Sequence, residues 1–398
     1  MKYGVFLAGA ALALSTTVAA EDDKKEKWNV AAPQIGATRD VAIDVDEGTW
    51  MSVDVSPDGR RIAFDLLGDI YTMPIGGGEA TAIAEGMPWE MQPRWSPDGS
   101  KIAFTSDRGG GDNIWIMNAD GSDKQPVTKE DFRLLNNPTW SPDGHDIAAR
   151  KHFTTQRSLG VGEIWLYHIS GGGGVPLVKK PSEGHQKELG EPIFSADGRY
   201  IYYSQNVTPG ATFIYAQDSN GDLFNIRRYD METGEITTAV SGEGGSVRPA
   251  PSPDGSKIAF VRRERMQSKL YIKDLATGEE RAIYNDLDRD LQEIWAVHGV
   301  YPNMDWMPNG RDLVFWAGGK IRRINTETGA SSVIPFRVNA TRTVVAAPRP
   351  DVAVAPDNFR TKMVKFASVS PDGRFVVFES LGKIYVKPMS GGSARRQW

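Results

Sequence analysis

The sequence predicts an all-β fold built from repeated four-stranded antiparallel sheets, and three features predict it. A four-residue turn of the type Ser-Pro-Asp-Gly occurs seven times. Each turn is followed by a short β-rich run, such as Lys101 to Phe104, whose composition suits a strand covered on both faces. A second glycine-containing turn recurs at a matched position, for example between Asn118 and Ser122. Two turns and four strands in each repeat are typical of one blade of a β-propeller.

The Ser-Pro-Asp-Gly turn has the chemistry of a tight hairpin. Pro97 fixes the dihedral angle of the first corner, Asp98 suits the second, and Gly99 takes the left-handed conformation that closes the loop. The turn glycines are 40 to 63 residues apart, so the longer intervals contain insertions into a blade of roughly 40 to 50 residues. The turn residues of the seven copies are Asp58 and Gly59, Asp98 and Gly99, Asp143 and Gly144, Asp197 and Gly198, Asp254 and Gly255, Asn309 and Gly310, and Asp372 and Gly373.

The ends of the repeat array leave two interpretations of the ring. Residues 38–45 alternate like a strand, and an N-terminal strand often completes the last blade of a propeller, so we expect them in that role. The last copy has expected strands at 365–370, 374–380 and 383–387, but its fourth strand would be residues 393–398, so this blade is expected to be truncated. Either residues 41–45 complete a seven-bladed ring, or the chain is a fragment. Alternatively, a six-bladed ring carries one extra repeat beyond the proline-containing segment 338–361.

The N-terminus and the composition indicate an exported protein. Residues 1–20 have the charged start, short apolar run and small residues of a secretory signal peptide, and the run is too short for a membrane anchor. Residues 21–37 are expected to be a disordered lead-in to a propeller over 38–398. The absence of cysteine excludes disulfides and thiolate chemistry and fits a bacterial periplasm. A net charge of −5 argues against a nucleic-acid partner.

Known catalytic signatures are missing from the sequence. It contains no Gly-x-Ser-x-Gly elbow, no His-x-His pair, no His-Glu-x-x-His motif and no Walker-type phosphate loop. We therefore expect no catalytic residue, metal ligand or cofactor within this chain.

Two segments carry candidate ligand-binding residues. The segment 150–158 gathers cations and hydroxyls, among them Arg150, His152 and Arg157, which could bind an anion or a peptide carboxylate. The insertion 285–305 is rich in acids and aromatics and contains Trp295 and His298. The alternative for the first segment is a solvated loop, because exposed charge is the ordinary state of such residues.

The repeat resembles the TolB-type propeller repeats, also called WD40-like or PD40 repeats. The resemblance lies in Ser-Pro-Asp-Gly with the following Lys-Ile-Ala-Phe and in residues 113–121, and it covers about residues 50–398. It is specific for the fold and weak for function.

A second resemblance comes from the order of five segments. Residues 46–51, 64–71, 134–138, 296–303 and 315–322 together look like the N-terminal propeller of exported bacterial proteins with a metal-dependent amidohydrolase barrel downstream. In that family the divalent metal and its histidines belong to the barrel, which is absent from this sequence. The family's activity is therefore carried over to no residue of this chain.

Three functions follow as hypotheses. The first is a periplasmic propeller that binds, gates or scaffolds for an amidohydrolase or peptidase domain, with a peptide or small molecule as substrate. The second is a freestanding TolB-like module that docks a protein of the cell envelope. The third is a propeller enzyme with a divalent-metal site in its channel, against which the scattered histidines argue.

Overall fold

The computed structural model describes residues 29–32, 36–154, 160–346 and 352–397, which fall into two compact units divided after Ala346. The described residues form strands and turns and no helix, and accordingly no membrane-spanning helix is found among them. The expected signal peptide and most of the expected lead-in lie outside the described residues. The all-β fold class predicted from the repeats is confirmed.

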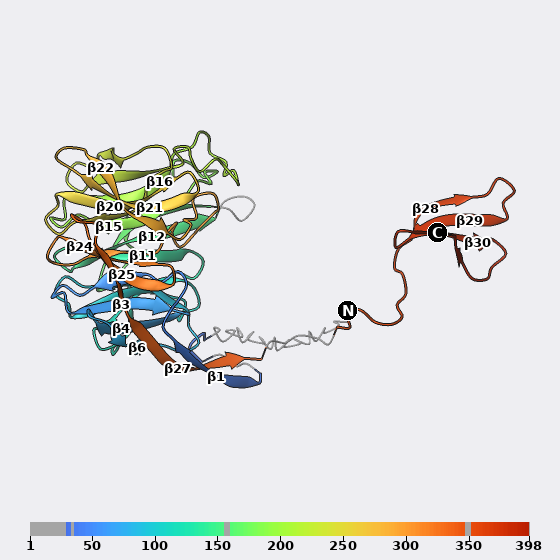
Figure 1. Ribbon diagram of the computed structural model, residues 1–398, viewed down its shortest axis with the longest axis horizontal. Helices are drawn as coiled ribbons and strands as arrows, with labels where there is room; N and C mark the ends of the chain where they lie inside the picture. The colour runs from blue at the N-terminus through green and yellow to red at the C-terminus, as the bar shows by residue number, and fades with distance from the viewer. Residues whose placement is uncertain (1–28, 33–35, 155–159, 347–351, 398) are drawn as a thin grey trace, which may run out of the picture. The chain divides into compact units, whose positions relative to one another are not determined.

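The first unit contains six four-stranded antiparallel sheets, one for each of the first six turns (Figure 1). Blades 1 to 3 are β2 (Val53–Val55), β3 (Arg61–Leu66), β4 (Asp69–Pro74) and β6 (Thr81–Ala84); β7 (Glu90–Trp95), β8 (Lys101–Ser106), β9 (Asn113–Asn118) and β10 (Gln125–Pro126); and β11 (Leu134–Trp140), β12 (Asp146–Thr154), β13 (Gly160–His168) and β14 (Val175–Val178). Blades 4 to 6 are β15 (Leu189–Phe194), β16 (Tyr200–Asn206), β17 (Phe224–Asp230) and β18 (Ile236–Val240); β19 (Val247–Pro251), β20 (Lys257–Glu264), β21 (Gln267–Asp274) and β22 (Glu280–Leu287); and β23 (Asp305–Trp306), β24 (Asp312–Ala317), β25 (Lys320–Asn325) and β26 (Ser331–Ile334).

Blade 6 meets blade 1 and closes the ring. The Val53 amide donates a hydrogen bond to the Asn303 carbonyl at 3.2 Å. The Val55 amide donates to the Asp305 carboxylate at 2.9 Å. The largest apolar cluster spans this junction, where Phe64 of blade 1 belongs to the same core as residues of blades 5 and 6. The ring therefore closes with six blades. This agrees with the alternative prediction of a six-bladed ring followed by one extra repeat.

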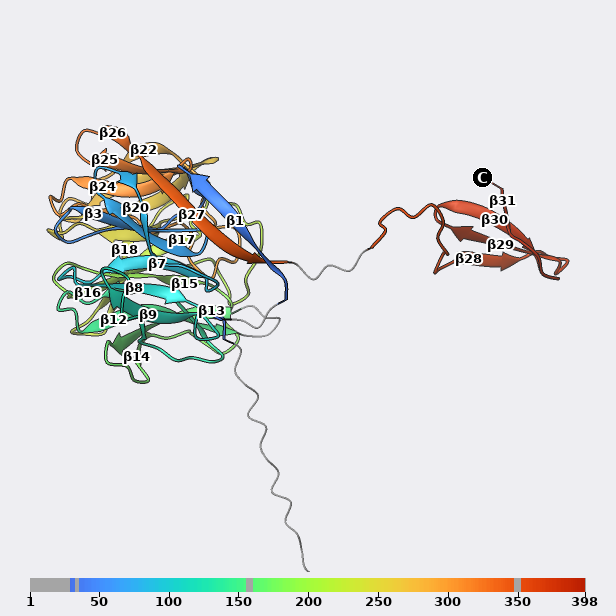
Figure 2. The same ribbon diagram turned by 90° about the horizontal axis from the view of Figure 1, so that it is seen from below.

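The expectation that residues 38–45 complete the last blade is wrong. Strand β1 (Thr38–Val45) pairs antiparallel with β27 (Phe336–Val345), and β27 also pairs with the short β5 (Gly78–Glu79), in a separate three-stranded sheet. The long β1 and β27 ribbons lie side by side in both views (Figure 2). The physical reason is that each blade draws its four strands from one continuous segment, so the ring leaves no strand position for β1 to occupy.

The repeated turn forms as its residues predict. In blade 2 the Ser96 hydroxyl donates to the Asp98 carboxylate at 2.6 Å, and the Gly99 amide donates to the Ser96 carbonyl at 2.8 Å. Gly99 has a φ of 70°, in the left-handed region. The Ser96 hydroxyl and the Ser100 amide lower the pKa of Asp98 to about 2. The turn is thus held by its own side chains as well as by its backbone.

The second unit contains one four-stranded sheet. Its strands are β28 (Lys365–Val369), β29 (Phe375–Ser380), β30 (Lys383–Pro388) and the two-residue β31 (Arg395–Arg396). The sequence predicted a blade truncated at its fourth strand within one propeller over 38–398. The structure instead gives a short fourth strand, paired with Tyr385 and Val386, in a unit of its own.

Candidate functional site

The loop between β22 and β23 lies across one end of the channel, and we call its residues 288–302 the capping segment. The His298 carbonyl accepts a hydrogen bond from the Gln92 side chain at 2.6 Å. The Val300 amide donates to Glu191 at 2.6 Å, and the Tyr301 carbonyl accepts from Arg248 at 2.6 Å. These hydrogen bonds connect the segment to the inner strands of three blades, so it packs against the ring.

The base of the capping segment is held by charge. Asp290 is buried and forms an ion pair with Arg263 of β20 at 2.6 Å, and its carboxylate also accepts from the Ser268 hydroxyl at 2.6 Å. Glu293 forms a further ion pair with Arg263. Two of the acids that made the insertion conspicuous in the sequence therefore serve to anchor it.

The residues that receive the capping segment occupy one repeated position, six residues before the turn Asp or Asn. All six are polar and buried: Ser52, Gln92, Asn137, Glu191, Arg248 and Asn303. In blades 2 to 5 this residue has a positive φ of 54° to 58° and lies at a β-bulge of the inner strand. Because a bulge re-aims a side chain out of the regular pleat, these positions can meet one another at the channel.

Glu191 and Arg248 form the centre of this polar layer. Their ion pair measures 3.0 Å, and both side chains are buried. The Glu191 carboxylate also accepts from the Arg248 amide at 2.8 Å and from the Ser204 hydroxyl at 2.5 Å. Arg248 donates to Asn303 at 2.5 Å and to Asn137 at 3.1 Å. Burial lowers the pKa of Arg248 to about 10, which leaves it charged at pH 7.

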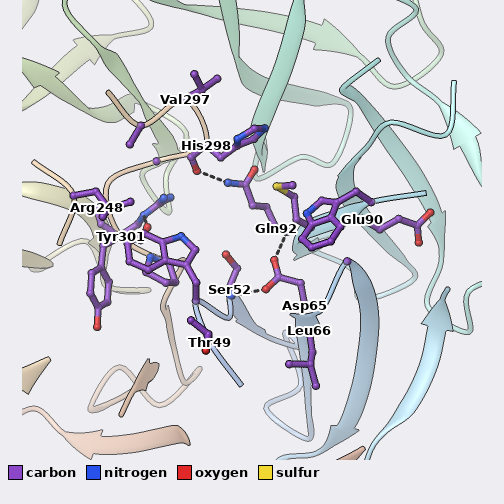
Figure 3. Close-up of a pocket in the computed structure, with 18 of the residues that line it drawn as sticks. Thr49, Ser52, Asp65, Leu66, Glu90, Gln92, Arg248, Val297, His298 and Tyr301 are labelled. Atoms are coloured by element: carbon purple, nitrogen blue, oxygen red, sulfur yellow. Dashed lines mark hydrogen bonds between the residues drawn. The ribbon is translucent and has the colours of Figure 1, made fainter. Parts of the chain in front are cut away.

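A pocket of about 390 Å³ opens beside the capping segment (Figure 3). Its polar wall includes Asp65, whose two oxygens accept from the amides of Ser52 and Gln92, each at 2.7 Å. Three tryptophans line it, from the segment before β2, the segment before β7 and the capping segment. The aromatic and aliphatic lining residues include Trp50, Trp89, Trp295, Leu66, Leu67, Leu291, Ile294, Val297 and Tyr301. A concave, largely apolar site with a few fixed polar groups is the usual form of a ligand pocket.

Apolar side chains are also exposed among the residues that line this pocket. Leu67 is 53% exposed, Trp89 52% and Ile294 47%. Leu67 lies in the turn between β3 and β4, Trp89 lies in the loop between β6 and β7, and Ile294 belongs to the capping segment. All three line the same pocket. Apolar surface gathered around a concave site marks a binding surface more strongly than scattered single residues do.

Arg150 and His152, the two candidate residues of the first predicted segment that the structure describes, are buried in a compact network. Arg150 pairs with Glu188 and lies 3.1 Å from the His152 ring nitrogen Nδ1. Burial and the Arg150 charge lower the pKa of His152 to about 3, so this imidazole is neutral at pH 7. The cavity at Arg150 and Glu188 measures only about 10 Å³, which is room for about one water molecule. No larger ligand fits there without movement.

The structure brings four of the five predicted residues into one neighbourhood. The Trp295 ring lies 5.4 Å from the His152 ring, which joins the capping segment to β12. The His298 ring nitrogen Nε2 lies 2.8 Å from the Asp112 carboxylate. Trp295 and His298 line the pocket, whereas Arg150 and His152 are not among its lining residues. Arg157 lies outside the described residues, and a ligand-binding role for any of the five stays a prediction.

The other mouth of the channel carries a second pocket, of about 320 Å³. Arg94 pairs with Asp54 at 2.7 Å there, and Asp305 lines the same space. Within the described residues no group of three or more His, Asp or Glu side chains is placed to hold a metal ion.

Comparison with known proteins identifies the repeat. The family model described as TolB beta propeller domain matches residues 22–164. An uncharacterized protein of Agrobacterium fabrum is 31% identical over 222 residues, which cover 52% of this chain and 68% of that protein. The chain belongs to the TolB-type β-propeller family.

Other relatives of this TolB-type propeller are much longer than the chain. A tricorn protease homologue of Streptomyces coelicolor is 31% identical over 253 residues, which cover 61% of this chain and 23% of that protein. The chain spans less than a third of the length of the first curated relatives it matches. The crystal structure of TolB from Acinetobacter baumannii superposes with a TM-score of 0.52 at 17% identity, covering 74% of this chain and 65% of that one. That likeness shows the fold.

Sequence reasoning missed the polar layer that receives the capping segment. Gln92, Asn137, Glu191 and Arg248 are chemically different, so they match no residue motif. Their common property is a fixed offset of six residues from the turn, with a polar side chain in each of the six ring repeats and Phe366 in the seventh. Aligning the repeats on the turn would have revealed it.

Proposed function

We propose that this TolB-type propeller is the substrate-binding and gating region of an exported hydrolase whose catalytic residues lie outside this chain. The observation that carries the proposal is the tryptophan-lined pocket at the end of the channel that the capping segment covers. Support comes from the relationship to a protein named as a tricorn protease homologue and from the sequence resemblance to amidohydrolase-associated propellers.

The pocket favours peptides with apolar side chains as ligands. Three tryptophans supply large rigid surfaces, while the side chains of Gln92 and His298 provide polar groups at the same wall. Because the capping segment is bonded to the inner strands, a ligand is expected to bind at this mouth rather than pass freely through the ring. By gating we mean that the capping segment and the pocket select which peptide segments of a substrate bind near the catalytic region.

A binding measurement tests this proposal. Short peptides with one aromatic or aliphatic residue are titrated into the chain by calorimetry, beside matched peptides in which that residue is serine. We expect binding of the apolar peptides only, weakened about 10-fold or more by Trp295→Ala or Trp89→Ala. Val175→Ala, on an exposed outer strand of blade 3, is the matched control and leaves binding unchanged. Equal binding of both peptide sets, or no effect of the tryptophan substitutions, would reject the site.

A second candidate is a freestanding module that docks an envelope protein. The exposed apolar side chains of Leu67, Trp89 and Ile294 favour it, because a protein partner can cover them while leaving the pocket empty. Pull-down of one specific envelope protein, lost in Trp89→Ala, together with absence of amide hydrolysis by the native gene product, would select this function. In either case the proposed location is the periplasm, in keeping with the expected signal peptide.

A further inference from the structure

The sheet of the second unit leaves apolar side chains uncovered by its own residues. Val377 of β29 is 38% exposed, Ile384 of β30 is 43% exposed and Val369 of β28 is 54% exposed. In the ring the position that corresponds to Val377 is buried. Val377 stands five residues after its turn Asp, as Ala103 does in blade 2, and Ala103 is fully buried. A four-stranded sheet with apolar faces needs neighbours to cover them.

The ring of the first unit has no position for this sheet. Its described residues close with six blades, because β2 of blade 1 is hydrogen-bonded to the segment that forms β23 of blade 6. Inserting a seventh blade would break those hydrogen bonds and the apolar cluster at the junction. This sheet therefore does not fit into the ring as a seventh blade.

The strand β28 also has the backbone conformation that is found in the channel-lining strands of the ring. Phe366 stands six residues before Asp372 and has a φ of 50° at a break in the strand register. Glu191 and Arg248 have the same offset, positive φ and bulge in the ring, where they line the channel. A positive φ is costly for a bulky residue, so its presence here indicates an inner strand of a propeller rather than an ordinary edge strand. Phe366 is 82% exposed within the second unit.

We propose that β28 to β31 form the first blade of a second propeller, and that further TolB-type blades following β31 in the native polypeptide cover both faces of this sheet. In that ring Phe366 occupies the channel position held by polar residues in the first ring. The second channel would then have at least one aromatic side chain at the level where the first has only polar and charged residues. This inference stands apart from the proposed function, since it uses no residue of the pocket.

Amide hydrogen exchange, read by mass spectrometry, tests the proposal on two molecules: the native polypeptide purified from its own cell, and the chain of residues 21–398. We expect the native polypeptide to continue beyond Trp398 and its β29 amides to exchange as slowly as those of β8. In the 21–398 chain the β29 amides should exchange about 100-fold faster or more than those of β8, because no neighbouring blade covers them. Val377→Asp should speed β29 exchange in the native polypeptide and change little in the shorter chain.

Three results would overturn the proposal. One is a native polypeptide that ends at Trp398. Another is slow β29 exchange in the 21–398 chain at every concentration, which would mean that the sheet is covered by its own chain. The last is protection that increases with concentration, which would assign the covering surface to a second copy. Peptide binding at the pocket is measured separately, so failure of one proposal leaves the other standing.

Discussion

The carboxylate of Glu191 and the guanidinium of Arg248 form a buried ion pair of 3.0 Å on which the capping segment rests. The two residues come from neighbouring blades and occupy the same position in their repeats. Glu191 accepts from the Val300 amide, and Arg248 donates to the Tyr301 carbonyl. One pair thus joins two inner strands and the segment that covers the channel.

Removing one partner of this pair should destabilise the protein strongly. Arg248→Met leaves the Glu191 carboxylate buried without its cation, and the free energy of unfolding should fall by about 3 to 5 kcal/mol. The double variant Glu191→Gln with Arg248→Met should lose less than the sum of the two single variants. Urea denaturation measures all three. The control is Arg337→Met, which breaks an exposed pair with Asp44 and should change little; similar losses for both arginines would contradict the role given to Arg248.

Gly299 should be required for the seating of the capping segment. Its φ is 111°, and a Cβ atom there would lie 2.2 Å from the Arg248 guanidinium and 3.0 Å from the Glu191 carboxylate. Gly299→Ala should therefore lower stability and weaken peptide binding. Gly172→Ala is the matched control, because its φ is 120° and no atom lies within 4 Å of the added carbon. The control should show the backbone cost alone, about 1 to 2 kcal/mol, with unchanged binding; equal effects of both substitutions would refute the packing argument.

The opposite mouth of the channel should give the protein a pH-dependent stability. Burial and the neighbouring Asp54 charge raise the pKa of Asp305 to about 8, above its ordinary value of 3.8. A raised pKa in the folded state means that the stabilisation present below pH 4 is lost as the pH rises toward 8. The free energy of unfolding should fall across this range, and Asp305→Asn should flatten the fall. Parallel pH profiles of the two proteins, measured by urea denaturation, would show that Asp305 is not the titrating group.

Strand β1 should be dispensable for the ring. Because β1 pairs with β27 outside the six blades, a variant that begins at Asp46 should keep the β-sheet circular dichroism and a cooperative unfolding transition. Its melting temperature should fall, since Val338 of β27 loses part of its cover. Loss of the folded state in this variant would mean that β1 closes the propeller after all.

Much of the fold was predictable because its signals are local. The turn at Ser96 to Gly99 is fixed by hydrogen bonds within five residues, and the run Lys101 to Phe104 that was expected to be a strand lies in β8. The partner of β1 was not predictable in this way. Its pairing with β27 joins residues about 300 positions apart, and strand alternation alone does not specify a partner.

The site was predictable only in part for the same reason. The long interval before Asn309 revealed the insertion that carries Trp295 and His298, because its length departs from the repeat. Arg150 can be buried because Glu188, which immediately precedes β15 of the next blade, supplies the compensating charge. A cluster of cations read from one segment cannot show such a partner, so Arg150 and His152 looked more exposed in the sequence than they are.

The measurement that tests the central claim most directly is the hydrogen-exchange footprint of a bound apolar peptide on the 21–398 chain. The account predicts slower exchange in the capping segment and in the loops around Leu67 and Trp89, with no change at Asp54 or Asp305. Protection confined to the Asp54 and Asp305 mouth, or none anywhere in the first unit, would contradict the claim that the covered end of the channel is the binding site.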